Sequence, residues 1–563
     1  MSLLKRLLAC FQPDTSRPLT QAWLAALWMG LLANWPLWQQ LRTLPEITGA
    51  RGLLFTVAFA GMVTAATGAL LSLLAWPRFI KGLLAMLLLS AGALAHFIGS
   101  YGIVFDPTMV VNIVQTDVRE TRDLLSWRLL ASTALLGALP AWWLLRRPAA
   151  PRQAFSKRLA GNLAGLGLGL VATVLLALSV FAELSSTMRN HKTLRYMVTP
   201  LNAVYSVSSA VLHGQAAPGG LPAVIGADAH LLPRADGAKP PLLLLVVGET
   251  ARAMNFSLNG YARPTNPELA TLPGLVSLRQ VSSCGTSTAA SLPCMFSPLG
   301  RTAFGDVKGT QENLLDVLQR AGLAVLWLDN QSGCKGLCDR VPNSSTAKLP
   351  QGAALLPAGL CHKDELGEEC FDEALLHALD KRIAALDPGR VKRGVVLVMH
   401  QMGSHGPAYF KRSPPDLKPF QPECRSNALQ ECPREQVING YDNTIATTDR
   451  LLARSIAWLQ TQASRFDPGL LYVSDHGESL GENGLYLHGM PYAMAPDEQT
   501  HVPMLLWLPQ DGGLAASLKP GCLQALRDKP ASHDNLFHTA MGWMGVRADV
   551  YKPEWDLLAG CRR

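Results

Sequence analysis

Long apolar runs fill the first third of the chain and predict a membrane domain. None of the runs contains Asp, Glu, Lys or Arg, and each is long enough to cross a bilayer as one helix, which takes about 20 residues. No small-residue cleavage site follows the first run, so we expect it to remain as an anchor rather than to be removed as a signal peptide. The five predicted spans are 19–41, 52–76, 82–105, 129–145 and 159–182.

After residue 240 the apolar runs become short, and each ends in polar residues. Four of them predict buried strands: LLLLVVGET (242–250), GLAVLWLDN (322–330), RGVVLVMHQMGSHG (393–406) and GLLYVSDHGES (469–479). Helical stretches at 312–321, 372–386 and 441–462 lie between or beside them. Strands that alternate with helices predict an α/β domain with a mostly parallel central sheet. Ligands of such sheets bind at the carboxyl ends of the strands.

Residues 184–240 join the two halves. The stretch RNHKTLRYMVTPLNAVYSV (189–207) mixes basic and apolar residues, as does a helix that lies along lipid headgroups, although a solvent-exposed linker helix would have a similar composition. The next residues are rich in Gly, Ala and Pro and are typical of a flexible tether. The expected organisation is therefore a five-helix transmembrane domain (1–183), a bridging helix and linker (184–240) and an α/β domain (241–563).

Basic residues orient the predicted bundle. They precede span one, separate spans two and three, and separate spans four and five: Lys5, Arg6, Arg17, Arg78, Lys81, Arg146, Arg147, Arg152, Lys157 and Arg158. Such residues are enriched in cytoplasmic loops, and an odd number of spans then exports everything after Glu183. The net charge of +8 suits loops beside anionic lipid better than a nucleic-acid surface, because the second half has no basic run.

The cysteines provide an independent test of this topology. Of 11 cysteines, all except Cys10 follow residue 283, and an even set confined to an exported domain indicates disulfides. A zinc ribbon is the alternative, but the second and third pairs lack matching CxxC spacing. Four pairs are close neighbours and one pair is left over: Cys284 and Cys294, Cys334 and Cys338, Cys361 and Cys370, Cys424 and Cys432, Cys522 and Cys561.

The polar strand ends suggest a metal site. Carboxylates and imidazoles that converge on one rim suit zinc, which takes oxygen and nitrogen ligands in about four positions. The alternative is that Asp475 caps the following helix and His476 only packs. The residues concerned are Glu249, His400, His405, Asp475, His476 and, one loop later, His488.

The stretch CGTSTAASLPC (284–294) places hydroxyls between two cysteines. A threonine or serine hydroxyl is a weak nucleophile near neutral pH, but a metal-bound alkoxide at a helix N-terminus is activated. A disulfide between Cys284 and Cys294 would hold the turn rigid against the metal. A structural loop with incidental hydroxyls is the alternative.

Four motifs resemble those of the lipid A phosphoethanolamine transferases, the family that includes the mobile colistin-resistance enzymes. They are GETARAMNFSLNGYARPTNPEL, CGTSTAASLPCMFS, HQMGSHGPAYFKR and YVSDHGESLGENGLYLHGMP. The resemblance extends to the five spans, to VVNIVQTDVRETRDLLSW (110–127) and to RNHKTLRYMVTPLN (189–202), and so covers nearly the whole chain. It implies a sulfatase- and alkaline-phosphatase-like catalytic domain in the periplasm, carried by a multi-pass protein of the bacterial inner membrane.

The resemblance also implies site residues. Thr288 would be the nucleophile, and one tight Zn²⁺, with a second weaker one possible, would be bound by Glu249, Thr288, Asp475 and His476. His405 and His488 would bind the phosphoryl group or the second zinc, and one of them would act as the general acid. Lys335 would reach the substrate, and Glu478 follows the zinc ligands. Asn112 and Glu120 would contact the ethanolamine end of the donor. His400 would pack around the site.

The implied reaction is zinc-dependent transfer of phosphoethanolamine from phosphatidylethanolamine to lipid A of lipopolysaccharide. It would pass through a phosphothreonine-type intermediate, reduce the negative charge of the cell surface and give resistance to polymyxin and other cationic peptides. The acceptor could instead be Kdo or heptose of the core. We expect a monomer without nucleic-acid partners.

Two other functions are compatible with parts of this sequence. A sulfatase-like hydrolase or a glycerophosphate transferase would keep the fold and the metal, but a sulfatase usually needs a CxPxR-type stretch, which LPCMFS does not match. A catalytically silent membrane-anchored binding protein is disfavoured because the nucleophile and all zinc ligands occur together.

Overall fold

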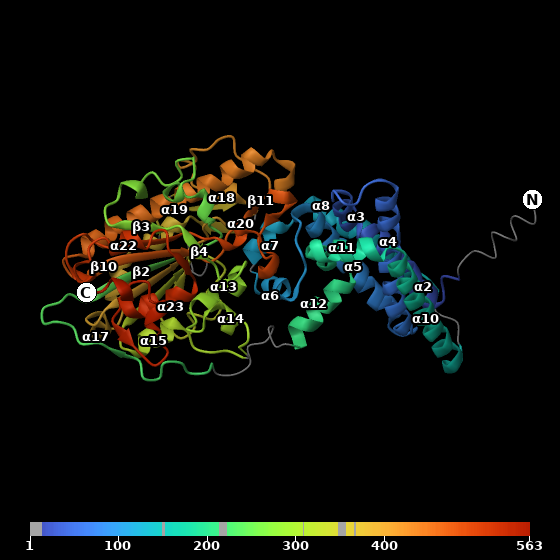
Figure 1. Cartoon of the computed structure of the whole chain (residues 1–563), viewed down its shortest axis with the longest axis horizontal. Coiled ribbons are helices and arrows are strands. Elements are labelled where there is room, and N and C mark those ends of the chain that lie inside the picture. Colours follow the sequence, from blue (N-terminus) through green and yellow to red (C-terminus); the bar gives the residue numbers. More distant parts are fainter. Residues whose placement is uncertain are drawn as a thin grey trace, which may run out of the picture. The chain divides into compact units, whose positions relative to one another are not determined.

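The chain forms two compact units, Met1–Pro107 with Leu125–Ser209, and Thr108–Leu124 with Ala210–Arg563. Figure 1 shows the helices of the first and the layered sheet of the second. Lys5, Arg6, Cys10 and Arg152 lie outside the described residues. The computed structural model describes residues 14–116, 118–148, 153–212, 222–307, 309–346, 356–357, 359–364 and 367–563.

In the first unit, four described helices are long and apolar enough to cross a membrane, and they coincide with predicted spans two to five. The third of them comprises α8 (Trp127–Ser132), a π-helical turn (Thr133–Ala138) and α9 (Leu139–Leu145). The other three are α4 (Gly49–Leu73), α5 (Ile80–Tyr101) and α10 (Phe155–Ser179).

The five-helix count is not confirmed, because the first predicted span is broken. It forms α2 (Pro18–Trp28), a π-helical turn (Met29–Ala33) and α3 (Trp35–Arg42). At the break, the Asn34 side chain donates to Met29 O (2.8 Å) and accepts from the Thr199 N–H (2.8 Å). Pro36 then starts α3, where its missing N–H costs nothing. A contact 165 residues away in the chain thus decides where this helix breaks.

Small residues let the membrane helices approach closely. A Cβ added at Gly137 would lie 2.8 Å from Leu88 O in α5, and one at Gly169 of α10 would lie 2.9 Å from Ala65 O in α4. Lipid provides no hydrophobic driving force between helices, so close packing of this kind supports their association.

The helix expected across residues 189–207 is interrupted. The chain forms α11 (Phe181–Asn190), a 3₁₀ turn (Lys192–Met197) and α12 (Leu201–Leu212). Pro200 explains the gap before α12, because the residue that precedes a proline is disfavoured in helical conformation.

A seven-stranded sheet forms the centre of the second unit, in the order β3-β13-β10-β2-β9-β5-β6. Neighbours from β10 to β6 are parallel, and only β13 runs antiparallel to its two neighbours, so the predicted mostly parallel sheet is confirmed. The strands are β2 (Pro241–Gly248), β3 (Leu275–Leu278), β5 (Ala324–Asp329), β6 (Asn343–Ser345), β9 (Val395–His400), β10 (Asp467–Ser474) and β13 (Met504–Trp507).

Helices cover both faces of this sheet (Figure 1). The β2 residues Leu243, Leu245 and Val247 pack in one core with α15 (Leu314–Arg320) and α23 (Asp534–Trp543), while α19 (Arg434–Gln462) covers the other face. The other helices of this unit include α6 (Pro107–Gln115), α7 (Val118–Leu124), α13 (Thr288–Met295), α14 (Gly300–Phe304), α16 (Leu379–Ala384), α17 (Pro388–Val391), α18 (Tyr409–Arg412), α20 (Asp497–Thr500), α21 (Gly513–Ser517) and α22 (Cys522–Ala525).

Short strand pairs and disulfides secure the loops. All ten cysteines that follow residue 283 are joined, in the four neighbouring pairs and the left-over pair described above. The short pairs are β1 (His230–Leu231) with β15 (Val546–Arg547), β4 (Gln280–Ser282) with β14 (Pro530–Ser532), β7 (Cys361–Asp364) with β8 (Gly367–Cys370), and β11 (Ser479–Leu480) with β12 (Tyr486–Leu487).

Candidate active site

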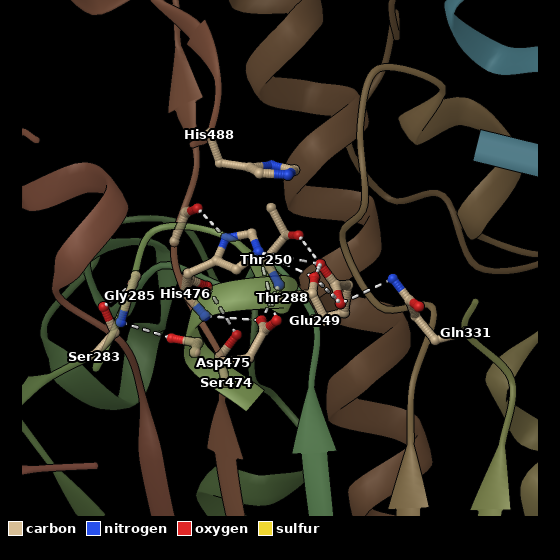
Figure 2. Close-up of polar contacts among 12 residues, drawn as sticks. Glu249, Thr250, Ser283, Gly285, Thr288, Gln331, Ser474, Asp475, His476 and His488 are labelled. Atoms are coloured by element: carbon tan, nitrogen blue, oxygen red, sulfur yellow. Dashed lines mark hydrogen bonds and ion pairs between the residues drawn. The ribbon is translucent and has the colours of Figure 1, made fainter. Parts of the chain in front are cut away.

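Neighbouring parallel strands deliver the candidate ligands to one rim of the sheet. Glu249 follows β2, and Asp475 and His476 follow the adjacent strand β10; all three side chains are fully buried. Each offers a ligand atom, and these atoms lie within 4.8 Å of one another. His476 Nε2 is 3.3 Å from Glu249 Oε1 and 3.5 Å from Asp475 Oδ2 (Figure 2).

The ligand atoms that are not used in hydrogen bonds at this rim suit a divalent metal. Asp475 Oδ1 accepts the backbone N–H groups of Thr250 (3.1 Å) and His476 (2.8 Å), whereas Oδ2 is buried and accepts no hydrogen bond from any described residue. His476 Nδ1 lies 2.9 Å from Gly477 O. A carbonyl only accepts, so Nδ1 carries a hydrogen, and Nε2 is the nitrogen that would bind zinc once the metal displaces its proton.

The pKa values of these groups show that they need positive charge between them. Burial, and then the charge of Glu249, raises the pKa of Asp475 to about 6. Burial alone would lower the pKa of His476, but Asp475 and Glu249 raise it to about 10. Burial also opposes ionisation of Glu249, yet the hydrogen bond and charge of His476 bring its pKa well below the usual value. A dication would compensate both carboxylates more fully than one imidazolium does.

Thr288 begins α13 and points its hydroxyl into the same cluster (Figure 2). Its Oγ1 is 3.1 Å from both carboxylate oxygens of Glu249 and 3.4 Å from His476 Nε2. Ser287 precedes it in extended conformation, and the disulfide between Cys284 and Cys294 joins the turn to the helix. The hydroxyl is therefore held beside the proposed metal ligands by a closed loop.

His533 ties this loop to the sheet, a role that the sequence did not indicate. Its Nδ1 accepts the Cys284 N–H (3.0 Å), and its Nε2 donates to Ser474 O (2.8 Å), one residue before Asp475. One nitrogen accepts and the other donates, so the ring must be neutral. Burial enforces this by lowering the pKa of His533 to about 4.

Two further predicted histidines gather beside His476. The ring of His488 lies 4.3 Å from that of His476 and 5.5 Å from that of His405, measured between centroids. Glu478 orients His488, since its Oε2 is 3.0 Å from His488 Nδ1 while its Oε1 accepts the Tyr409 hydroxyl (2.9 Å). Burial raises the pKa of Glu478 to about 8.

His400 lies behind Glu249. Its Nδ1 is 3.2 Å from Asp329 Oδ2, which also accepts the Trp327 indole N–H (2.9 Å). Its Nε2 is 4.0 Å from Glu249 Oε2. Burial alone would lower the pKa of His400, but Asp329 raises it. The expected role of His400 in packing around the site remains a prediction.

The remaining predicted residues are Lys335, Asn112 and Glu120. Lys335 Nζ donates to Ser332 Oγ and to Gln115 O, both at 3.0 Å. Asn112 lies half-buried in α6, in the same unit as the site. Glu120 lies in α7, but its side chain is outside the described part of the structure. The assignment of these three residues to the substrate remains a prediction.

The sequence analysis missed two direct neighbours of Glu249. Gln331 Nε2 donates to Glu249 Oε2 (3.1 Å), and Thr250, in left-handed conformation (φ 60°), donates to Glu249 Oε1 (2.6 Å) (Figure 2). The signal was present, because Gln331 follows a predicted strand as Asp475 does. An amide is not a typical zinc ligand, so the residue type gave no metal signal at this position.

Comparisons with known proteins give a consistent result. A family described as sulfatase matches residues 241–546, and one described as phosphoethanolamine transferase EptA/EptB matches residues 63–214. Phosphoethanolamine transferase EptA of Salmonella typhimurium is 39% identical over 533 residues, 93% of each chain. Phosphatidylethanolamine transferase Mcr-1 of Escherichia coli is 37% identical and covers 94% of this chain and 95% of its own.

A solved structure extends this similarity to the whole fold. It is the integral membrane lipooligosaccharide phosphoethanolamine transferase A of Neisseria meningitidis, which is 31% identical. The TM-score is 0.88, and the match covers 96% of this chain and 98% of that one.

Proposed function

Since the chain belongs to the phosphoethanolamine transferase EptA/EptB family, we propose that it moves phosphoethanolamine from phosphatidylethanolamine to lipid A by a zinc-dependent, covalent route. Relatives named for these substrates support the donor and acceptor, among them phosphatidylethanolamine transferase Mcr-1 and a Kdo(2)-lipid A phosphoethanolamine transferase of Salmonella typhimurium. The observation that carries the covalent route is the Thr288 hydroxyl, 3.1 Å from Glu249 and 3.4 Å from His476.

The residues that would hold zinc are Glu249, Asp475, His476 and Thr288. A bound Zn²⁺ supplies a Lewis acid that lowers the pKa of a coordinated hydroxyl and stabilises charge on phosphoryl oxygens. Gln331 and Thr250 donate to the two oxygens of Glu249 and thereby fix the orientation of this carboxylate. These four residues would form the tight zinc site.

In the first half-reaction the Thr288 oxygen attacks the phosphorus of phosphatidylethanolamine. The bond to the glycerol oxygen breaks, and diacylglycerol leaves with a proton from His405 or His488, whose rings flank the site. Glu478 and Tyr409 hold the ring of His488 in the orientation required for this transfer. In the second half-reaction a lipid A oxygen attacks the same phosphorus as its proton passes to the histidine, the bond to the Thr288 oxygen breaks, and Thr288 regains the proton that it released in the first half-reaction.

Both substrates are lipids, which accounts for the membrane domain. The four apolar helices and five disulfides support a multi-pass inner-membrane protein with its catalytic domain in the oxidising periplasm. The added ethanolamine amine reduces the negative charge of lipid A and so its attraction for cationic peptides such as polymyxin.

The covalent intermediate can be tested directly. Detergent-solubilised, zinc-loaded protein is incubated with phosphatidylethanolamine and no acceptor, and its mass is measured with peptide mapping. We expect one phosphoethanolamine adduct on Thr288, absent in Thr288→Ala. Thr286→Ser is the matched control, because Thr286 bonds to Met490 O and not to Glu249, and its protein should form the adduct normally. No adduct and no released ethanolamine phosphate, with zinc bound, would mean that the donor is wrong.

A further inference from the structure

The segment 108–124, which links two predicted spans, belongs to the catalytic unit and carries a buried carboxylate into it. Asp123 in α7 is only 3% exposed at its side chain. One of its oxygens is 2.6 Å from Arg412 Nη2 and the other is 3.1 Å from Lys411 Nζ. Its backbone carbonyl accepts the side-chain amide of Asn427 at 2.6 Å.

Arg412 connects this carboxylate to the active-site loop. Its guanidinium is 4% exposed, and its Nε donates to the backbone carbonyl of His405 (3.1 Å). Its Nη1 is 2.7 Å from Glu369 Oε2, in the hairpin closed by the disulfide between Cys361 and Cys370. A single side chain thus joins Asp123 to the loop that presents a proposed catalytic histidine.

Asp123 places a carboxylate between two cations. Its two oxygens contact Lys411 and Arg412, and Arg412 also contacts Glu369. Removal of the Asp123 charge would take one carboxylate away from both cations, and loss of a partner is costly for a buried ion. The guanidinium would then have to reorient, and its bond to His405 O would change with it.

Other contacts of the segment reach the same site. Lys335 Nζ donates to Gln115 O (3.0 Å). A Cβ added at Gly489, the residue after His488, would lie 2.7 Å from Met109 Cε. Three residues expected at the substrate, His405, His488 and Lys335, are therefore contacted directly or through one neighbour by the segment 108–124.

We propose that Asp123 is a positioning residue for phosphoethanolamine transfer, which acts through Arg412 on the His405 loop. The catalytic part of this inference rests on the proposed function. Asp123 fixes the position of the Arg412 guanidinium, and this guanidinium fixes the backbone carbonyl of His405. The imidazole of His405 is thereby held in place for proton transfer. The other end of the loop is fixed independently, because the Ser404 N–H donates to Glu249 O (3.0 Å).

The test uses full-length, zinc-loaded protein in detergent and the variant Asp123→Asn, which keeps the shape but removes the charge. We expect the rate of Thr288 adduct formation to fall about 10- to 100-fold, as small misplacement of a reacting group can do. Asp123→Glu, which retains the charge, should recover most of the rate. Asp416→Asn is the matched control, since Asp416 pairs with Arg450 (2.8 Å) at 71% exposure and should react normally.

A second measurement does not depend on catalysis. Amide hydrogen exchange in residues 404–412 should accelerate in Asp123→Asn but not in Asp416→Asn. The rate of adduct formation gives a further check with the variants Asp123→Asn, Arg412→Lys and their combination. Because both changes break the same connection, the double variant should form the adduct no more slowly than the slower of the two single variants. Unchanged exchange in Asp123→Asn, or a rate equal to that of Asp416→Asn, would overturn the inference. A wild-type protein that forms no adduct would instead contradict the proposed function, and the exchange result would still decide whether Asp123 positions the loop.

Discussion

Four buried histidines in the catalytic unit fall into two groups according to their partners. His476 and His400 lie beside carboxylates, which raise their pKa despite burial. His533 and His538 contact backbone groups, which offer little charge, so burial lowers the pKa of each to about 4. The first group suits a site where charge is compensated, whereas the second requires neutral rings that bridge one donor and one acceptor.

His538 should make stability depend on pH. Its Nδ1 accepts the Lys552 N–H (3.0 Å) and its Nε2 is 3.3 Å from Pro298 O. The pKa is about 4 in the folded protein and about 6.5 when unfolded, so the unfolded chain binds this proton first as pH falls. The free energy of unfolding should therefore fall between pH 6.5 and 4, by up to about 1.4 kcal/mol per pH unit from this group.

Denaturant unfolding of the wild type and of His538→Gln across this range measures the effect. The variant should be less stable at pH 7.5, because it loses the ring, but its stability should change less with pH. The remaining dependence should include that of His533, which has the same sign. Parallel pH profiles for the two proteins would show that His538 is not the responsible group.

Among the elements, strand ends and disulfide-closed turns contribute different groups to the candidate site. Parallel strands bring Glu249 and Asp475 together because their carboxyl ends meet at one rim. The hydroxyl that faces them comes instead from a helix start, held by a disulfide across 10 residues. The pair Cys522 and Cys561 closes 39 residues at a place where no predicted site residue lies.

Removal of these two disulfides should separate stability from activity. By loop-closure entropy, Cys522→Ser/Cys561→Ser should lower the free energy of unfolding by about 4 kcal/mol, and Cys284→Ser/Cys294→Ser by about 3 kcal/mol. At a temperature where both remain folded, only the second should slow formation of the Thr288 adduct, by about 10-fold or more. Equal loss of rate in both double variants, measured by mass spectrometry, would argue against a specific role for the loop around Thr288.

In the membrane unit, polar contacts link helix ends that the charge pattern assigns to the same side. Lys81 Nζ, in the first turn of α5, donates to Leu145 O (3.4 Å) and to Arg147 O, at and just after the end of α9. Arg51, in the first turn of α4, pairs instead with Glu183 of α11 (3.1 Å). The structure thus groups these helix ends as the positive-inside rule does.

Cysteine labelling in a Cys10→Ser background tests this topology. Arg51→Cys should react with an impermeant maleimide in intact spheroplasts, and Arg78→Cys only after the inner membrane is permeabilised. Both native side chains are exposed, so accessibility alone does not distinguish them. Reaction of Arg78→Cys in intact spheroplasts would reverse the predicted orientation.

Local patterns in the sequence were sufficient for the mostly parallel sheet and for the candidate metal-binding group at its rim. Apolar length predicted four of the membrane helices, and short buried runs predicted the parallel strands with Glu249 and Asp475 at their ends. These features depend on residues close together in the chain, so their signal can be recognised without a structure.

Only the tertiary structure decided which atoms remain available to bind a ligand and which distant residues contact one another. The break at Asn34 depends on Thr199, the turn of Thr288 on His533, and the His405 loop on Asp123 through Arg412. Each of these links joins residues more than 160 positions apart, except Arg412 with His405. Packing brings such residues together, and no local periodicity records it.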